Sequence, residues 1–412
     1  EIRNCDWSSD VCSSDLAKRL GVKAGTPFYQ LRQLFPNVRI EAFSSNYELY
    51  GEITGRVMTI IRDMAPQCFR YSIDEAFAIL DGFSVEQLKE WGEELHRRVL
   101  QSVGMPLTIG IAPTKTLAKM ASHFAKKYAG YNHCCVIDTD DRRLKAAALY
   151  PIGEVWGIGR RYAARLESYG IRTAYDFATH SHSWVRATFK TVVVERTWAE
   201  LNGTDCVPDD LPAKKKSICT SRSFSGMVCD FDTLRTHVAN FAARCAEKLR
   251  KQQSAASIVG VFVESNRFRP DLTQYCNMTE VNLSTPSSST IEVVKAATAC
   301  LRRIYREDIQ YKRAGVVLMG VVPNAAVQTD LFTFDVEKYQ HMMQLDSAVD
   351  RINKVDGTET VILSSQQYPN GRKFADAIKH DLKSACPTTR WSDIIKLRSE
   401  EHTSELQSQF RI

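Results

Sequence analysis

The chain has 412 residues, of which 44% are hydrophobic and 25% are charged. This composition predicts a folded protein of two to four domains and excludes collagen-like and wholly disordered chains. The longest uncharged apolar stretch, residues 314–329, contains Pro323 and Asn324 and is shorter than the roughly 20 residues that span a bilayer. We therefore expect no membrane span and, because the sequence shows no signal peptide, a cytoplasmic protein.

Positive charge is concentrated in one part of the chain. The net charge is +6, yet residues 214–320 carry 17 Lys and Arg against nine Asp and Glu. Such a segment favours a polyanionic partner, and a solvated basic surface without a partner is the alternative.

The two ends of the chain lack the periodicity of helices or strands. Residues 1–16 repeat Ser-Ser-Asp, and residues 398–412 are similarly patternless. We interpret both segments as foreign adapter sequence, with ordinary disordered termini as the alternative. The informative protein is then expected to begin near Ala17.

Between residues 17 and 134, helical and strand patterns alternate. Residues 17–46 are basic and loop-rich, with a short helix expected over 27–35. The patterns then predict, in order, a helix over 47–62, a strand over 69–80, a helix over 85–101, a strand over 107–111 and a helix over 114–128. This order indicates a sheet backed by helices.

The helix predicted over 114–128 separates two kinds of side chain, with Thr114 expected as its N-cap. At 100° per residue, one face is formed by Leu117, Met120, Ala121 and Phe124, and the opposite face by Lys115, Lys119 and Lys126. The lysine face is either solvated or functional, and the pattern alone leaves both open.

Residues 152–161 predict two short helices around a Gly157-Ile-Gly159 turn, as in a helix-hairpin-helix motif. Glycines let the backbone approach a phosphate, whose charge is stabilised by exposed N–H groups and by the N-terminus of the next helix. A plain connector between helices is the alternative.

After a Lys-rich linker at residues 211–216, the order of elements predicts a second unit. Strands are expected over 217–224, 257–264, 278–283 and 315–322, with a helix after the first strand and another after the third. The order β-α-β-β-α-β is that of ferredoxin-like folds, whose helices cover one side of the sheet. Because this unit is the basic segment, positive charge on its free face would suit a duplex backbone.

Asp74 and Glu75 are adjacent carboxylates in the apolar strand predicted over 69–80. Acids in such a setting are costly unless a partner neutralises them, and a divalent cation is a strong candidate. Because neighbouring strand residues point to opposite faces, the two acids share one site only if the strand bends or ends there. An ordinary surface pair is the alternative.

Three motifs stand in order along the chain: Tyr71-Ser-Ile-Asp-Glu-Ala-Phe77, Ile109-Gly-Ile-Ala-Pro-Thr-Lys-Thr-Leu-Ala-Lys119 and Val155-Trp-Gly-Ile-Gly-Arg160. Together they closely resemble the Y-family translesion DNA polymerases, and residues 17–27 resemble the finger region of that family. The motifs at residues 44–50, 195–197, 244–250 and 388–393 narrow the resemblance to the UmuC branch. The resemblance covers about residues 17–397.

The resemblance implies an α+β fold of several domains, arranged as the right hand of a Y-family polymerase. The implied domains are partial fingers over 17–46, a palm over 47–134, a thumb with the helix-hairpin-helix over 135–210, a ferredoxin-like little finger over 211–325 and a UmuC-type C-terminal region over 326–397.

The resemblance also implies template-directed DNA synthesis past damaged bases, as in SOS mutagenesis, by two-metal nucleotidyl transfer from dNTP to a primer on template DNA. Asp74 and Glu75 would be the palm carboxylates that hold Mg²⁺ at the primer end. Lys18 and Lys126 match positions that contact the triphosphate. DNA phosphates would be held by Gly157, Gly159, Arg160, Arg161 and Arg222.

Gln328-Thr-Asp-Leu-Phe332 follows the last predicted strand, where the resemblance places a peptide that binds the sliding clamp. Leu331 and Phe332 would enter an apolar groove while Gln328 makes hydrogen bonds. Residues 335–397 resemble the branch-specific tail that contacts UmuD and RecA.

One family motif is missing from the chain. Y-family chains open with a strand that carries another metal-binding Asp in a D-x-N-x-[FY]-A-S-C-E motif, which does not occur here. We therefore expect a palm without its first strand and a truncated, impaired copy of an active polymerase. The alternative is a non-catalytic protein that binds DNA and the sliding clamp.

Overall fold

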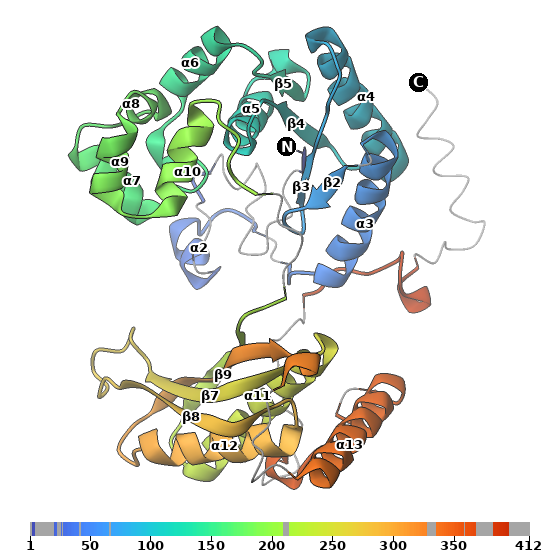
Figure 1. Cartoon of the computed structure of the whole chain (residues 1–412), viewed down its shortest axis with the longest axis vertical. Helices are drawn as coiled ribbons and strands as arrows, with labels where there is room; N and C mark the ends of the chain where they lie inside the picture. The colour runs from blue at the N-terminus through green and yellow to red at the C-terminus, as the bar shows by residue number, and fades with distance from the viewer. Residues whose placement is uncertain are drawn as a thin grey trace. The chain divides into compact units, whose positions relative to one another are not determined.

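The computed structural model describes residues 2–4, 20–22, 26, 28–40, 43–65, 67–208, 214–327, 335–357, 359–367 and 382–394. The chain divides into two compact units (Figure 1). Unit 1 is Glu1–Leu211 together with His380–Ile412, and unit 2 is Pro212–Lys379.

A five-stranded mixed sheet forms the core of unit 1. Its spatial order is β2 (Cys68–Arg70), β3 (Glu75–Ala78), β1 (Ile2–Asn4), β4 (Leu107–Ile111) and β5 (Cys134–Val136). β1 pairs antiparallel with both β3 and β4, and β5 pairs parallel with β4.

The strand β1 corrects our expectation that the sheet lacks its first strand. Arg3 lies opposite Glu75 on one side and opposite Thr108 on the other. Without a strand at this position, β3 and β4 would each leave a row of backbone N–H and C=O groups unpaired inside the sheet. The expectation rested on a missing side-chain motif, whereas strand pairing uses the backbone. The residues of β1 are Ile, Arg and Asn, so this strand carries no carboxylate.

The strand expected over 69–80 is broken into a hairpin. The N–H groups of Tyr71 and Ser72 both donate to the carbonyl oxygen of Glu75, at 2.9 and 3.1 Å. This tight turn over residues 71–74 separates β2 from β3. Asp74 therefore lies in the turn, and Glu75 is the first residue of β3.

Nine α-helices of unit 1 lie within the described residues. They are α2 (Phe28–Leu34), α3 (Tyr47–Met64), α4 (Val85–Val103), α5 (Lys115–Lys127), α6 (Asp140–Leu149), α7 (Arg160–Ser168), α8 (Ala174–Ala178), α9 (His182–Phe189) and α10 (Val192–Leu201), with short 3-10 turns at Ala129–Tyr131, Ile152–Glu154 and Trp391–Asp393. The helices predicted over 47–62, 85–101 and 114–128 are confirmed as α3, α4 and α5.

Helices cover both faces of this sheet. α3 and α4 pack on one face, where Val57, Leu95 and Ile109 belong to one buried cluster. α5 lies on the other face at Gly110, where an added Cβ would be only 2.1 Å from the carbonyl oxygen of Ala118. Consecutive strand residues face opposite sides, so Ile109 and Gly110 mark the two faces. The helix with the predicted lysine face thus rests directly on the backbone of β4.

Unit 2 is a four-stranded antiparallel sheet with helices on one face. Its order is β6 (Ile218–Val228), β9 (Tyr311–Pro323), β7 (Ser254–Ser265) and β8 (Cys276–Ser287), and its helices are α11 (Phe231–Lys251) and α12 (Thr290–Ile304), followed by α13 (Val336–Val355) and short 3-10 turns at Asn324–Ala326 and Ser364–Gln366. The chain order from β6 to β9 is β-α-β-β-α-β, so the predicted ferredoxin-like arrangement is confirmed.

The free face of this sheet carries little of the segment's positive charge. Val261 and Ala314 point into the core beneath the helices. On the opposite face, Arg313 Nη1 lies 3.6 Å from Glu264 Oε2, and Glu280 lies on the same face because it is paired with Gly260. Other cations of the segment lie on α11 and α12 instead.

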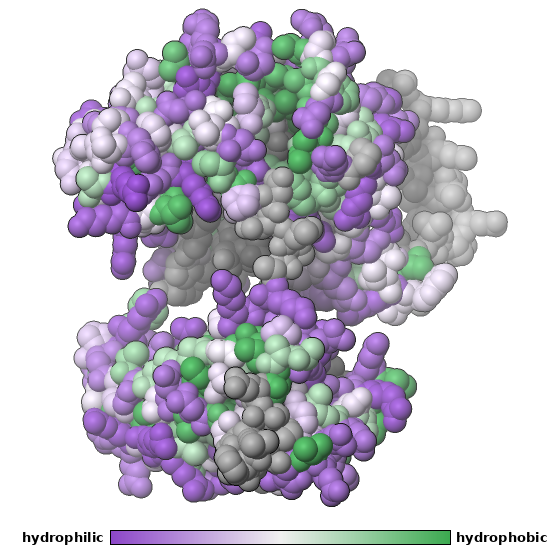
Figure 2. Space-filling view, viewed as in Figure 1, coloured by the Kyte–Doolittle hydropathy of each residue, from purple (hydrophilic) through white to green (hydrophobic). Residues whose placement is uncertain are grey.

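No helix within the described ranges is long and apolar enough to cross a membrane. Hydrophilic residues predominate on both units in the view of Figure 2.

Candidate active site

The two predicted catalytic acids lie at the junction of the 71–74 turn and β3. The Ser72 hydroxyl donates to Asp74 Oδ1 at 2.5 Å, and the Asp74 N–H donates to the Ser72 hydroxyl oxygen at 3.2 Å. Both acids are half-buried. Because Asp74 precedes the strand, the alternation of strand faces does not force its side chain away from that of Glu75. The bend that a shared site requires is therefore present.

Glu75 is paired with a lysine of α5. Lys119 Nζ lies 3.1 Å from Glu75 Oε2, and Lys119 is only 5% exposed. Its ammonium group also lies 4.9 Å from the ring centre of Tyr71 and 5.5 Å from those of Phe77 and Trp156. Cation–π attraction and a carboxylate partner offset the cost of burying a lysine. Lys119 thus belongs to the interior rather than to a solvated lysine face.

The aromatic cage around Lys119 is the part of the site that sequence reasoning missed. The indole N–H of Trp156 donates to the Tyr71 hydroxyl oxygen at 3.2 Å, although the two residues are 85 positions apart. Tyr71 and Phe77 flank the two acids in the sequence motif, so the sequence did signal that these two rings lie near the acids. Trp156 lies in the hairpin motif and gave no signal of contact with the acids.

The donor set of Asp74 and Glu75 suits one Mg²⁺ ion. A cavity of about 10 Å³ touches both acids, but it lies on the α3 side of the sheet and is otherwise lined by Arg70, Thr54 and mainly apolar residues, including Val57, Met58 and Leu107. It therefore does not mark an ion site. Mg²⁺ is commonly held by one or two carboxylates, with water and substrate phosphates as its other ligands. Within the described residues, no group of three or more His, Cys, Asp or Glu could hold a metal ion. The pair alone therefore does not provide the ligands of a two-ion site.

Arg70 lies beside the acids and is held by the neighbouring backbone and by α3. One guanidinium nitrogen, Nη2, donates to the Thr54 hydroxyl oxygen and to the Ile73 carbonyl oxygen, the latter at 3.2 Å. The guanidinium group fixes the outer end of the 71–74 turn against α3.

The predicted nucleotide-binding lysines are placed only in part. Lys126 is exposed in the last turn of α5, seven residues after Lys119 and so about 10 Å further along the helix. Lys18 lies outside the described residues.

The helix-hairpin-helix residues form an exposed turn. Gly157 has φ +90°, and Gly159 is the N-cap of α7 without a side-chain cap bond. Arg160 and Arg161 are exposed at the start of that helix. The backbone N–H groups of the first turn of α7 need partners other than the helix itself, as in a phosphate-binding turn.

The remaining predicted contacts are less favourably placed or outside the described residues. Arg222 is half-buried in β6 and lies opposite Ala314, so it shares the helix-covered face of the sheet rather than the free face. Gln328, Leu331 and Phe332 of the predicted clamp-binding peptide lie outside the described residues.

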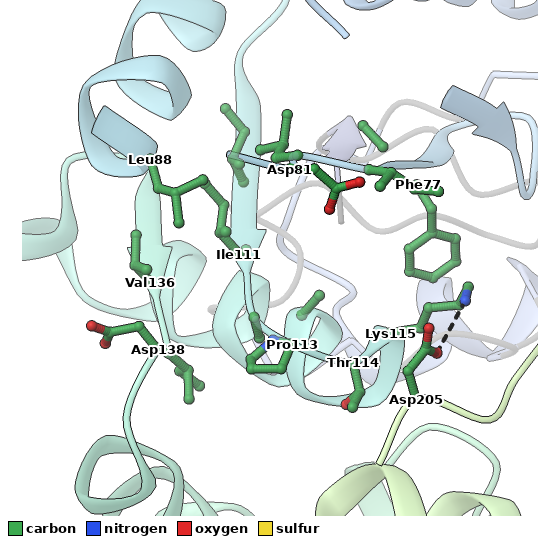
Figure 3. Close-up of a pocket in the computed structure, with 18 of the residues that line it drawn as sticks. Phe77, Asp81, Leu88, Ile111, Pro113, Thr114, Lys115, Val136, Asp138 and Asp205 are labelled. Carbon is green, nitrogen blue, oxygen red and sulfur yellow. Dashed lines mark hydrogen bonds and ion pairs between the residues drawn. The ribbon is translucent and has the colours of Figure 1, made fainter. Parts of the chain in front are cut away.

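A larger cavity of about 400 Å³ lies at the N-terminal end of α5 (Figure 3). Phe77, Pro113 and Thr114 line it, and Lys115 Nζ lies 3.4 Å from Asp205 Oδ1 at its rim. Neither Asp74 nor Glu75 is among its lining residues. This cavity is therefore separate from the predicted catalytic pair. The size of a cavity alone does not identify the candidate active site in this protein.

Comparison with known proteins identifies the family. The profile of the impB/mucB/samB family matches residues 6–123, which begins within the segment interpreted as foreign, and the profile of the C-terminal domain of that family matches residues 215–331. Protein UmuC of Salmonella typhimurium is 35% identical over 96% of this chain and 93% of its own length. The chain belongs to the impB/mucB/samB family.

Other relatives agree with this family assignment. Protein ImpB of Salmonella typhimurium is 33% identical over 93% of this chain and 90% of its own length. DNA polymerase IV of Dehalococcoides mccartyi is 25% identical over 84% of each chain. Residues 343–397 match a family described as a domain of unknown function, DUF4113.

A solved structure shows the fold. A Y-family DNA polymerase chimera is 20% identical, with a TM-score of 0.58 over 78% of this chain and 90% of that chain. The predicted α+β fold of the Y-family polymerases is thereby confirmed.

Proposed function

We propose that this chain is a DNA-directed DNA polymerase of the translesion class, which extends a primer past damaged template bases with dNTPs as substrates. The observation that carries the proposal is the position of Asp74 and Glu75. These two consecutive carboxylates lie where a turn enters β3, with the bend that lets both side chains serve one site, in a chain of this family and fold.

The acids and the lysines would have different roles in nucleotidyl transfer. When bound, Mg²⁺ would activate the primer 3′-oxygen and neutralise charge on the pyrophosphate leaving group. Asp74 and Glu75 would hold it, and Lys119 would act as a positioning residue that fixes the Glu75 carboxylate. Lys126 and Lys18 would bind the triphosphate of the incoming nucleotide.

The domains would share the binding of DNA and partners. Unit 1 would contain fingers, palm and thumb, with Gly157, Gly159, Arg160 and Arg161 on the duplex phosphates. Unit 2 would be the little finger and would contribute Arg222 from its edge strand. Gln328, Leu331 and Phe332 would engage the sliding clamp, and the C-terminal region would contact UmuD and RecA during SOS mutagenesis.

Primer extension by the full chain with Mg²⁺ tests the assigned acids. Asp74→Asn should lower the extension rate about 100-fold or more, because a lost metal ligand removes several kcal/mol of transition-state stabilisation. Asp141→Asn is the matched control, since Asp141 is an exposed acid beside another acid in α6. The control should change the rate by less than about twofold. Equal extension by the wild type and Asp74→Asn would refute the metal role.

One observation favours a second candidate function, that of a non-catalytic protein that binds DNA and the sliding clamp. Glu75 is already neutralised by Lys119, and the described residues provide no third acid beside the pair. Salt-dependent binding of primer–template DNA without any primer extension by the wild type would favour this candidate. Measurable extension that is lost in Asp74→Asn would exclude it.

A further inference from the structure

The proposed chemistry leaves the motif at residues 195–197 without a role. Thr197 of this motif lies on α10, and Glu200 follows it by three residues, so the two side chains share one face of the helix. Both residues are buried, with exposed fractions of 4% and 0%. Buried polar side chains need hydrogen-bond partners, and the partners of these two lie in different parts of unit 1.

Thr197 holds the hairpin that precedes α7. Its hydroxyl group donates to the carbonyl oxygen of Trp156 at 3.3 Å and to that of Val193, one turn earlier in α10, at 3.1 Å. An added Cβ at Gly157 would lie 2.3 Å from the same hydroxyl oxygen, so α10 and the hairpin backbone are in close contact. The hairpin is therefore fixed to α10 at the residue whose indole N–H donates to the Tyr71 hydroxyl oxygen.

Glu200 holds the N-terminal end of α5. Its carboxylate oxygen Oε2 accepts the N–H of Thr116 at 2.8 Å, and Oε1 accepts the N–H groups of Cys206 and Val207 at 3.2 and 3.1 Å. The hydroxyl of Thr114, the N-cap of α5, donates to the main-chain carbonyl oxygen of Glu200 at 2.9 Å. A carboxylate also suits the positive end of the helix dipole. Glu200 therefore joins the end of α10 to the first turn of α5.

The carboxylate of Glu200 does more than fill space. Burying a charge is costly, and an apolar side chain would fill the same volume without that cost. The hydrogen bonds of a carboxylate are directional, so they set both the distance and the direction of the α5 backbone relative to α10. Lys119 lies three residues after Thr116, about 4.5 Å further along the same helix. A shift at this end of α5 would therefore also move Lys119 relative to Glu75.

We propose that α10 couples the hairpin to α5, with Thr197 and Glu200 as the two positioning residues. The hairpin is the proposed phosphate-binding turn, and α5 carries Lys119. The coupling keeps this turn at a constant distance from the Lys119–Glu75 pair, so that bound DNA and the proposed metal-holding acid stay in one arrangement. Thr197 and Glu200 act through other residues, and their role rests on the proposed function.

Hydrogen exchange at single amides of the full chain tests the coupling without any need for activity. Two amides report on the two contacts, the Thr116 N–H bonded to Glu200 and the Ile158 N–H, which donates to the Val155 carbonyl oxygen in the hairpin. Glu200→Gln should raise the exchange rate of Thr116 by about tenfold or more, because an amide accepts more weakly than a carboxylate. It should also raise the exchange rate of Ile158 severalfold. Thr197→Val should have its larger effect on Ile158 and a severalfold effect on Thr116.

Glu167→Gln and Thr59→Val are the matched controls. Glu167 is exposed on α7. Thr59 is exposed on α3, and its hydroxyl donates to the carbonyl oxygen of Gly55, four residues earlier, at 3.2 Å, as the Thr197 hydroxyl does within α10. Both controls should leave the two reporter amides unchanged. Effects confined to the amide beside each substitution would overturn the coupling, as would unchanged exchange at both amides.

Single-nucleotide primer extension at saturating DNA and dNTP tests the effect on catalysis. Thr197→Val and Glu200→Gln should each lower kcat about tenfold, with a smaller change in KM for dNTP, because small displacements of positioned groups cost up to about 100-fold in rate. Thr197→Ser keeps the hydroxyl and should restore kcat to within about twofold of the wild type. Unchanged kcat in both variants would overturn the positioning role. A wild type that extends no primer would refute the proposed function instead, and the exchange rates would then decide the coupling.

Discussion

The residue-level feature that distinguishes this site is a lysine buried among aromatic rings and paired with the proposed catalytic acid Glu75. Lys119 and Glu75 each lie in positions where an unpaired charge would be costly, since their side chains are 6% and 15% exposed. The pair keeps the Glu75 carboxylate in one place, and the rings of Tyr71, Phe77 and Trp156 keep the ammonium group there.

A double-mutant cycle measures this pairing. Lys119→Met and Glu75→Gln should each lower the free energy of unfolding by about 1–3 kcal/mol, because each leaves a poorly solvated partner. The double variant should lose less than the two single losses combined, by about 1–3 kcal/mol. Urea unfolding of the full chain gives all three values. Strict additivity would mean that the ion pair contributes nothing.

At the residue scale, the sequence shows which residues could form the site better than it shows which residues contact one another in the fold. Asp74 and Glu75 stand out because adjacent acids are rare in an apolar run. The burial of Lys119 was not predictable from helical periodicity, which assigns a residue to a face but does not say what covers that face. Its cover comes partly from Trp156, which is distant in the sequence.

Among the elements, the hairpin before α7 depends on one glycine more than on the other. Gly157 has φ +90°, and an added Cβ would lie 2.3 Å from the Thr197 hydroxyl oxygen. That hydroxyl is held by the carbonyl oxygens of Val193 and Trp156, at 3.1 and 3.3 Å. Gly159 has φ −81° and open space around an added Cβ.

The two glycines therefore predict opposite outcomes for the same substitution. Gly157→Ala should lower the free energy of unfolding by about 1–3 kcal/mol, since both backbone and packing oppose it. Gly159→Ala should leave it unchanged or raise it by up to about 1 kcal/mol. Urea unfolding midpoints decide the matter, and equal effects at both positions would contradict the assigned strain.

Elements with strong local patterns were predictable and those made by distant pairing were not. α3, α4 and α5 carry their periodicity within one stretch, as do the strands of unit 2. The break between β2 and β3 depends on hydrogen bonds to Glu75, and β1 depends on pairing with strands more than 70 residues away. Periodicity contains no information on such partners.

At the scale of the whole molecule, the excess of basic residues in one segment did not show which surface of the fold carries the positive charge. The segment with 17 basic residues turns a nearly neutral sheet face to solvent, because strand alternation places Arg313 beside Glu264. DNA binding should then rest more on the exposed hairpin of unit 1 than on this face.

The salt dependence of DNA binding tests which of these two surfaces contacts the DNA phosphates. The double variant Arg160→Ala and Arg161→Ala should reduce the slope of log affinity against log salt concentration by about two, one for each lost phosphate contact. Arg313→Ala is the control and should change the slope by less than about one. Fluorescence anisotropy with duplex DNA between about 50 and 200 mM salt gives these slopes. A larger change for Arg313→Ala would reverse the assignment.

The contact of α5 with Gly110 also determines how accurately Lys119 is positioned next to Glu75. Ala118 and Ser122 approach that glycine through main-chain atoms, so the gap between helix and sheet is fixed by peptide groups rather than by adaptable side chains. Substitutions elsewhere in the core can repack without changing this gap. A methyl group at position 110 would wedge the helix outward and carry the Lys119 ammonium away from its acid.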